Sequence, residues 1–178
     1  MSGKVDTRAM FGGMKKAKGR ANSNYVRGGH YWANITLVKA DANRTGDEFV
    51  AIEMQIVKVV DDYEGKGHRL NEEVTHMLMT RHDSFMGNIK SFISKVLDIP
   101  QADVDEDAAE AVVAADQPLA NTVCEFRARE VMTKKNTPFT QIDYVREVPI
   151  DEVASECEDG VLDVAFPKGV LEALLAAD

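Results

Sequence analysis

The sequence predicts a mainly β domain that carries a helical insertion and ends in a short helix. Three observations lead to this fold class. Five segments alternate between apolar and polar residues, two segments between the third and the fourth repeat their apolar residues at helical spacing, and turn-forming residues separate the segments. The chain has 178 residues, of which 44% are hydrophobic and 29% are charged, and these values suit one globular domain of ordinary size.

The first two predicted strands form a long hairpin. Residues 30–39 and 49–60 both alternate between apolar and polar side chains, and a turn over residues 41–48 joins them. Trp32 and Phe49 fall on the outward-facing positions of their strands. The inward-facing positions are occupied by Tyr31, Ala33, Ile35, Leu37, Val50, Ile52, Met54 and Ile56.

A third strand and two helices are predicted to follow. A turn over residues 63–69 leads to the strand at 73–80. Residues 83–99 repeat their apolar side chains at spacings of three and four, which predicts an amphipathic helix that Pro100 ends. Residues 103–116 are rich in alanine and begin with acidic side chains, which favour a helix N-terminus.

Two more strands complete the predicted sheet. They span residues 121–132 and 139–148 and are joined by a turn at 133–138. An acidic stretch and a short apolar helix at 169–177 come after them. Three strands, a helical insertion and two further strands are the layout of a five-stranded OB-fold barrel.

Charge is distributed unevenly along the chain. The formal net charge is −9, and residues 1–30 carry seven basic side chains and one acidic side chain, a sum of +6. Residues 31–178 therefore sum to −9 − 6 = −15, and much of this charge lies in residues 97–117 and 147–163. We expect three parts: a basic, glycine-rich, flexible arm (1–29), an OB-fold domain (30–148), and an acidic tail with a terminal apolar helix (149–178).

No pattern typical of catalysis or metal binding is found in the sequence. His76 and His82 lie six residues apart with no cysteine near them, which is not the ligand spacing of a zinc site. The acidic run that starts at Asp103 begins like a calcium-binding loop, but Ala108 stands where that loop requires glycine. We therefore expect a protein that is not an enzyme and that holds no cofactor and no metal.

The cellular setting can also be predicted. No run of about 18 apolar residues is present, and the N-terminal residues lack the apolar region of a signal peptide. Cys124 and Cys157 lie in unlike contexts and form no disulfide framework, and Cys124 falls on an inward-facing position. We expect a protein of the host-cell cytoplasm that makes no contact with a membrane.

Aromatic and basic side chains gather in the arm, in the turns and on the outward-facing positions of the strands. Aromatic rings stack on bases with about 1–3 kcal/mol each, and lysine and arginine neutralise phosphates. For Trp32 the alternative is a packing role at the edge of the core, and Arg127 and Arg129 have the alternative of pairing with Glu53 or Glu125. The candidate nucleic-acid-binding residues are Lys15, Lys16, Lys18, Arg20, Arg27, Trp32, Arg44, Phe49, Arg127, Arg129, Lys134, Lys135 and Phe139.

Several segments resemble a known family. The stretches YVRGGHYWANITLVKA, GDEFVAIEMQIVKV, RHDSFMGNIKSFISKVLDI and ANTVCEFRAREVMTKKNTPFTQIDYV resemble small bacteriophage proteins of the OB-fold single-stranded DNA-binding type. Members of that family share a glycine-bearing leader, a G-[DE]-x-[FY] turn, a G-x-I-K helix segment and a late T-K-K/R turn. The corresponding residues here are Gly46–Phe49, Gly87–Lys90 and Thr133–Lys135, and the resemblance covers residues 20–146.

The resemblance implies a protein that binds single-stranded DNA without strong sequence preference during phage replication and recombination. It also implies that an acidic C-terminal tail recruits replication or recombination proteins, while self-association stays open. The sequence departs from the family at this tail, where a helix replaces a bare apolar tip. Two alternatives stand beside this interpretation: a module that binds a host or phage protein through its acidic surface, and an accessory protein whose arm orders on assembly.

Overall fold

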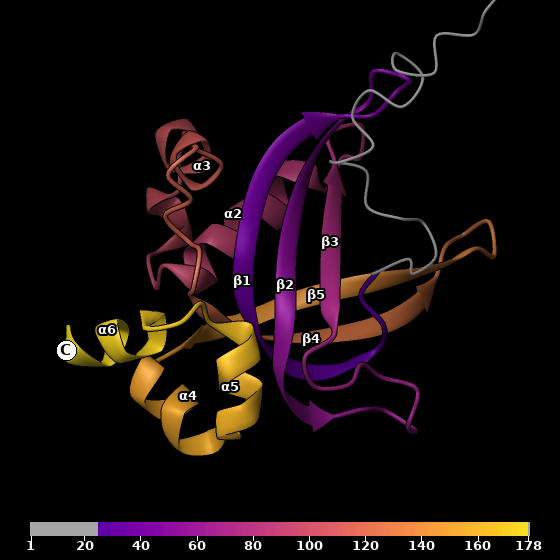
Figure 1. The fold of residues 1–178 in the computed structure, drawn as a ribbon. Coiled ribbons are helices and arrows are strands. Elements are labelled where there is room, and N and C mark those ends of the chain that lie inside the picture. Colours follow the sequence, from indigo (N-terminus) through magenta and orange to yellow (C-terminus); the bar gives the residue numbers. More distant parts are fainter. Residues whose placement is uncertain (1–24, 178) are drawn as a thin grey trace, which may run out of the picture.

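The computed structural model describes residues 25–177 and contains a five-stranded antiparallel sheet (Figure 1). The strands lie in the order β3-β2-β1-β4-β5, and the sheet is open, because the edge strands β3 and β5 do not pair with each other. The mainly β fold class is therefore confirmed, whereas a closed barrel is not seen. The strands are β1 (Gly29–Ala42), β2 (Glu48–Asp61), β3 (Glu73–Met79), β4 (Val123–Met132) and β5 (Pro138–Val148).

The sheet folds over along β1. This long strand pairs with β2 over most of its length, but only its first half, from Gly29 to Asn34, pairs with β4. The β4–β5 hairpin can therefore diverge from β2 and β3, and Figure 1 shows it crossing behind these two strands. The inner faces of the two parts enclose the first hydrophobic core, which includes Tyr31, Ile35, Ile52, Met54 and Phe126.

Helices inserted between β3 and β4 cover one opening of this core. They are α2 (Phe85–Val96), the short 3-10 helix η2 (Gln101–Asp103) and α3 (Glu106–Val112). The buried face of α2 follows the predicted spacing of three and four residues, and its Phe92 ring lies 4.8 Å from the ring of Tyr144 in β5. The Asp105 side chain caps α3 by accepting a hydrogen bond from the Ala108 amide.

The inward-facing side of β1 changes at a bulge. Between Ile35 and Leu37 the register with β2 shifts by one residue, so that Thr36 is the extra residue. As a result Val38 lies in the first core, and Leu37 does not. The prediction that Leu37 shares the inward face was wrong, because a strict alternation gives no sign of a bulge. The inward positions predicted in β2 are all confirmed.

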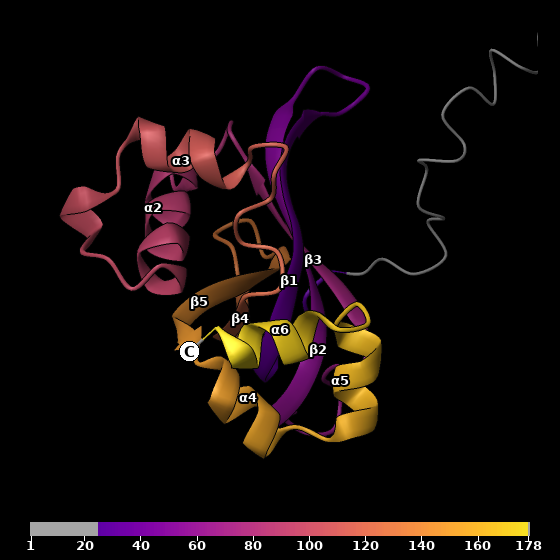
Figure 2. The same ribbon diagram turned by 60° about the vertical axis from the view of Figure 1, so that its left-hand side comes forward.

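The C-terminal residues form a folded cap on the outer face of the sheet. The cap consists of α4 (Ile150–Glu156), α5 (Asp159–Ala165) and α6 (Val170–Ala176), which Figure 2 shows grouped against the sheet. An acidic tail with one terminal helix was expected, but three helices are found here. A second core joins cap and sheet, and it contains Trp32, Val57, Val123, Val148, Val153, Cys157, Val161, Leu162, Ala165 and Phe166.

Candidate nucleic-acid interface

A cleft of about 490 Å³ opens between the two edge strands, β3 and β5, beside the first turn of α2. Its polar lining includes His76, His82, Asn88 and Asp143. Such a volume and a mixed apolar and polar lining are typical of binding sites for small ligands or parts of larger ones. The apolar residues of the lining are Met77, Leu78, Met79, Phe85, Phe139 and Ile142.

One side-chain contact bridges the two edge strands at the base of the cleft. His76 Nδ1 of β3 lies 2.9 Å from the Tyr144 hydroxyl of β5, and the two rings are 5.8 Å apart. Burial disfavours the charged form of each group: it lowers the pKa of His76 to about 4 and raises the pKa of Tyr144 well above its usual value. Both groups are therefore neutral near pH 7, and they add no charge to the cleft.

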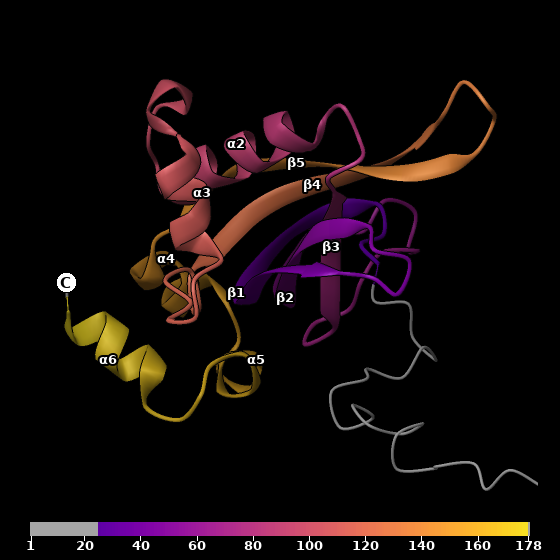
Figure 3. The same ribbon diagram turned by 90° about the horizontal axis from the view of Figure 1, so that it is seen from above.

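The β4–β5 hairpin extends beyond the rest of the sheet on one side of the cleft (Figure 3). Its turn is closed by a hydrogen bond from the Thr133 amide to the Thr137 carbonyl oxygen and by one from the Thr137 amide to the Thr133 hydroxyl, and Asn136 adopts the positive φ that this tight turn requires. Lys134 and Lys135 are exposed in the turn, and neither has an ion-pair partner within residues 25–177. The turn therefore presents to solvent two cations that no other residue of the described range 25–177 neutralises.

Phe139 lies near the start of β5, directly after the turn that contains these two lysines. Its ring lines the cleft and is 49% exposed, and it lies opposite Val131 in the register of the hairpin. Arg127 and Arg129 project from the outer face of β4, as predicted, and both are exposed. Arg129 lies 3.8 Å from Asp143, a contact too long and too exposed to neutralise it, and neither arginine pairs with Glu53 or Glu125.

The β1–β2 loop carries a second, smaller group of predicted residues. Arg44 is exposed there, and Phe49 is half-buried at the start of β2. Phe49 lies opposite Met79, which lines the cleft. The side chains of Asn43 and Thr45 donate hydrogen bonds to the Asp47 carboxylate and lower its pKa. These bonds hold the loop together, and the loop therefore contains a carboxylate anion as well as Arg44.

Trp32 lies on the outward-facing side of β1, as predicted, but the C-terminal cap covers it. Only 5% of the residue is exposed, and its ring belongs to the second core. The prediction that Trp32 is available to stack on a base is therefore wrong, and the alternative packing role holds. Lys58 Nζ lies 4.3 Å from the ring centroid and Arg146 Cζ lies 5.6 Å from it, so two cations flank the indole.

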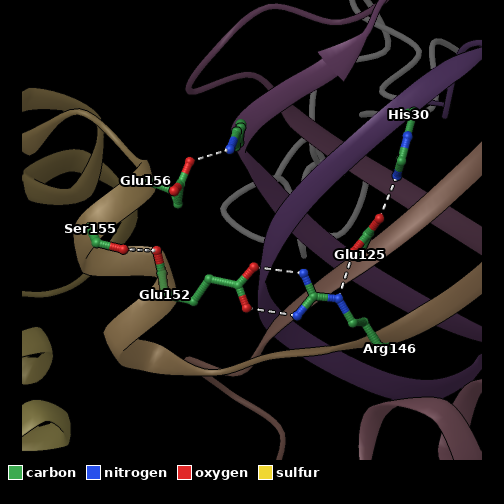
Figure 4. Close-up of polar contacts among 7 residues, drawn as sticks. His30, Glu125, Arg146, Glu152, Ser155 and Glu156 are labelled. Carbon is green, nitrogen blue, oxygen red and sulfur yellow. Dashed lines mark hydrogen bonds and ion pairs between the residues drawn. The ribbon is translucent and has the colours of Figure 1, made fainter.

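The same two cations fasten the cap to the sheet (Figure 4). The Arg146 guanidinium donates two hydrogen bonds of 2.8 Å to the Glu152 carboxylate in α4, which lowers the pKa of Glu152 and raises that of Arg146. Lys58 pairs with Glu156 at 2.9 Å. Arg146 also donates to Glu125, whose other oxygen lies 2.6 Å from His30 Nε2. These groups hold the cap in place and are not free for a ligand.

Arg27 is engaged where the described chain enters β1. Its guanidinium donates hydrogen bonds of 2.6 and 2.9 Å to the Glu72 carboxylate, and its amide donates to His68 Nε2. Burial lowers the pKa of His68, so the neutral ring accepts this bond. For Glu72, burial alone would raise the pKa, but hydrogen bonds from the Arg69 amide and His68, together with the Arg27 charge, lower it. Arg27 is thus an anchor of the chain.

The structure divides the predicted residues into distinct groups. Arg127, Arg129, Lys134, Lys135 and Phe139 come together on the hairpin. Arg44 and Phe49 lie on a separate loop, while Trp32 and Arg27 serve the fold. The remaining four, Lys15, Lys16, Lys18 and Arg20, lie outside the described residues.

Sequence reasoning missed the part that β3 plays in the cleft. His76 lies on an inward-facing position of this strand, between Val74 and Leu78. A histidine on an otherwise apolar inward face needs a polar partner or an opening to solvent, and it has both here. His76, a polar residue on this inward face, was therefore the feature of the sequence that could have predicted the opening between β3 and β5.

Within residues 25–177 no group of three His, Cys, Asp or Glu side chains is arranged to hold a metal ion. Cys124 and Cys157 are both buried and unpaired, and burial raises the pKa of the Cys124 thiol to about 12. In the same part of the chain, no helix has the length and apolar character needed to cross a bilayer.

Comparison with protein-family models gives no match for this chain, and comparison with curated proteins gives none either.

Proposed function

We propose that the protein binds single-stranded DNA, without strong sequence preference, along the β4–β5 hairpin and the adjoining cleft. The observation that carries this proposal is the hairpin itself. It carries a half-exposed aromatic ring, Phe139, on the same two strands and turn as Lys134, Lys135 and Arg127, three cations that have no ion-pair partner among residues 25–177. Aromatic rings that stack on bases beside cations that contact phosphates are the usual means of binding single strands without sequence readout.

The fold supports the proposal by analogy. A long first strand shared between two halves of the sheet, with a helix after the third strand, is the arrangement of a partly open OB barrel. In such barrels the second and third strands and the loops after strands one and four bind the nucleic acid. The hairpin turn, the cleft beside β3, and the β1–β2 loop with Arg44 correspond to these positions.

The arm and the biological setting complete the proposal. Lys15, Lys16, Lys18 and Arg20 would add contacts to the DNA backbone outside the sheet. We propose further that this activity serves phage replication or recombination within the host cytoplasm, as the resemblance of the sequence to phage single-stranded DNA-binding proteins implies. Proteins of those processes are the expected partners.

Fluorescence anisotropy with a labelled oligo-dT of about 30 nucleotides tests the proposal, beside a duplex of the same length. The account predicts tight binding of the single strand that weakens steeply with salt, and much weaker binding of the duplex. Absence of single-strand binding at low salt, or equal binding of the duplex, would contradict it.

A second candidate is favoured by the surface of the helical insertion. Asp103, Asp105, Glu106, Asp107 and Glu110 are exposed there, and none has an ion-pair partner among residues 25–177. Such a surface suits a basic protein partner better than a nucleic acid. Capture of a partner protein that is lost when Glu106, Asp107 and Glu110 are changed to glutamine or asparagine would support this candidate.

A further inference from the structure

The cleft between β3 and β5 lies between two strand edges that lack a second strand partner in the described part of the chain. Near the start of β3, Thr75 forms an isolated bridge with Tyr25. The following residues of β3, 76–79, line the cleft. Apolar side chains of Met77, Phe139 and Ile142 line the opening. Unpaired strand edges beside apolar side chains are the usual acceptors of an extended segment.

The described chain begins at this same strand edge. Tyr25 lies beside Thr75 of β3, Val26 is buried in the first core, and Arg27 is fastened to Glu72. The N-terminal arm is thus tethered within one residue of His76, the first residue of the cleft lining. Tethering raises the effective concentration of the arm near the cleft to the millimolar range.

The arm contains a group of apolar residues that the proposed function leaves unused. Met10, Phe11 and Met14 lie within five residues, with Gly12 and Gly13 between them, and only glycine, alanine and basic residues follow as far as Ala21. Moving a methionine or phenylalanine side chain out of water into an apolar site is favourable. Methionine also makes favourable contacts with aromatic rings. The lining of the cleft contains two methionines, Met77 and Met79, and two aromatic residues, Phe85 and Phe139.

The connecting chain is long enough for this contact. Ten residues, 15–24, join Met14 to Tyr25. Ten residues can extend over at most about 35 Å. The strand from Thr75 to Met79 covers only about 13 Å.

We infer that Met10–Met14 of the arm docks into the cleft between β3 and β5 of the same molecule. Phe11 and the two methionines fill the apolar opening, and Gly12 and Gly13 let the backbone approach the strand edges. This inference does not rest on the proposed function. If the proposed function also holds, a DNA strand entering the cleft displaces the segment and frees the neighbouring lysines.

Phe11→Trp provides a probe, because the only native tryptophan, Trp32, is buried and contributes a constant background. Docking predicts that acrylamide quenches the new tryptophan at least about threefold less than it quenches a free peptide of residues 1–24 with the same substitution. Adding Phe139→Asp in the cleft, or Met10→Asp with Met14→Asp in the arm, should restore quenching to the level of the peptide. The arm variants leave the folded domain untouched.

Met86→Asp is the matched control, since Met86 is 70% exposed on α2 and does not line the cleft. In this control the new tryptophan should stay protected from acrylamide. The protein should also be monomeric, and the protection should persist when it is diluted about a hundredfold. A probe as accessible as the free peptide overturns the inference. Protection that is found only when the protein is dimeric also overturns the inference, because the arm then lies in the cleft of the other molecule. No nucleic acid is present, so a negative result leaves the proposed function standing.

Discussion

At the scale of single residues, Phe139 and Trp32 show that two aromatic side chains of one sheet can have different roles. Both rings lie on strands of the sheet, but the C-terminal cap covers Trp32, while Phe139 lines the open cleft and stays 49% exposed. A covered ring contributes to stability, whereas a half-exposed ring next to cations is available to a ligand. We therefore expect substitution of Phe139 to affect binding and substitution of Trp32 to affect stability.

Phe139→Ala should weaken single-strand binding by about 1–3 kcal/mol, which is roughly a 5- to 150-fold loss of affinity. Because the ring is already half-exposed, thermal stability should change little. Titration of the variant with oligo-dT and a thermal melt measure the two effects. Met86→Ala, which removes an exposed apolar side chain outside the cleft, should change neither.

His76 predicts a pH dependence of stability. Its folded-state pKa of about 4 lies below the ordinary value of 6.5, so the unfolded chain binds more protons between these pH values. The free energy of unfolding should therefore fall as the pH drops from 7 to 4, by at most about 3 kcal/mol. The other titratable groups near the ring are Tyr144 and the cleft residues His82 and Asp143.

Urea titrations at pH 7 and pH 4 test this prediction in the native protein and in His76→Gln. The variant should lose less stability on acidification. The pKa of His68 is lowered in the same direction, so a part of the pH dependence should remain. An unchanged pH dependence in the variant would show that His76 is protonated in the folded state at pH 5.

At the scale of elements, the C-terminal cap depends on a few buried contacts. Leu162 of α5 is buried in the second core, so Leu162→Ala should cost about 2–5 kcal/mol of stability. Loosening the cap should also expose Trp32 and shift its fluorescence emission to the red. Val164→Ala, two residues away on the exposed side of the same helix, is the control and should change neither quantity.

Much of the element order could be read from the sequence, because alternating and helical spacings are local patterns. The cap was missed although a pattern was present: Val153, Cys157, Val161 and Ala165 recur every fourth residue. The many acidic residues between them suggested a solvated tail. The bulge at Thr36 and the opening between β3 and β5 depend on contacts between distant segments, which no local pattern reveals.

The hairpin is the element that should determine how binding depends on salt. Each phosphate contact contributes about 0.7 to the slope of log affinity against log salt concentration for single strands. Replacing both Lys134 and Lys135 with glutamine should therefore lower the slope by about 1.4. Titrations at several salt concentrations measure it. Lys95→Gln on α2 removes one exposed cation outside the hairpin and cleft, and an equal loss there would contradict the assignment.

At the scale of the whole molecule, charge directs where an anionic strand can lie. Residues 31–178 sum to −15, and exposed carboxylates concentrate on α3 and the cap. These regions repel a polyanion, while the hairpin presents cations with no partner in the described chain. The same distribution explains why a strongly acidic protein carries a basic arm: the arm is attracted either to a nucleic acid or to the body of the protein.

Photochemical cross-linking of oligo-dT to the native protein, followed by identification of the modified peptides, tests the central claim most directly. The account predicts cross-links in residues 133–143 of the hairpin and 76–88 beside the cleft, and these should disappear at high salt. Cross-links confined to the cap, or none at a concentration that saturates binding, would contradict the claim that the hairpin and cleft hold the strand.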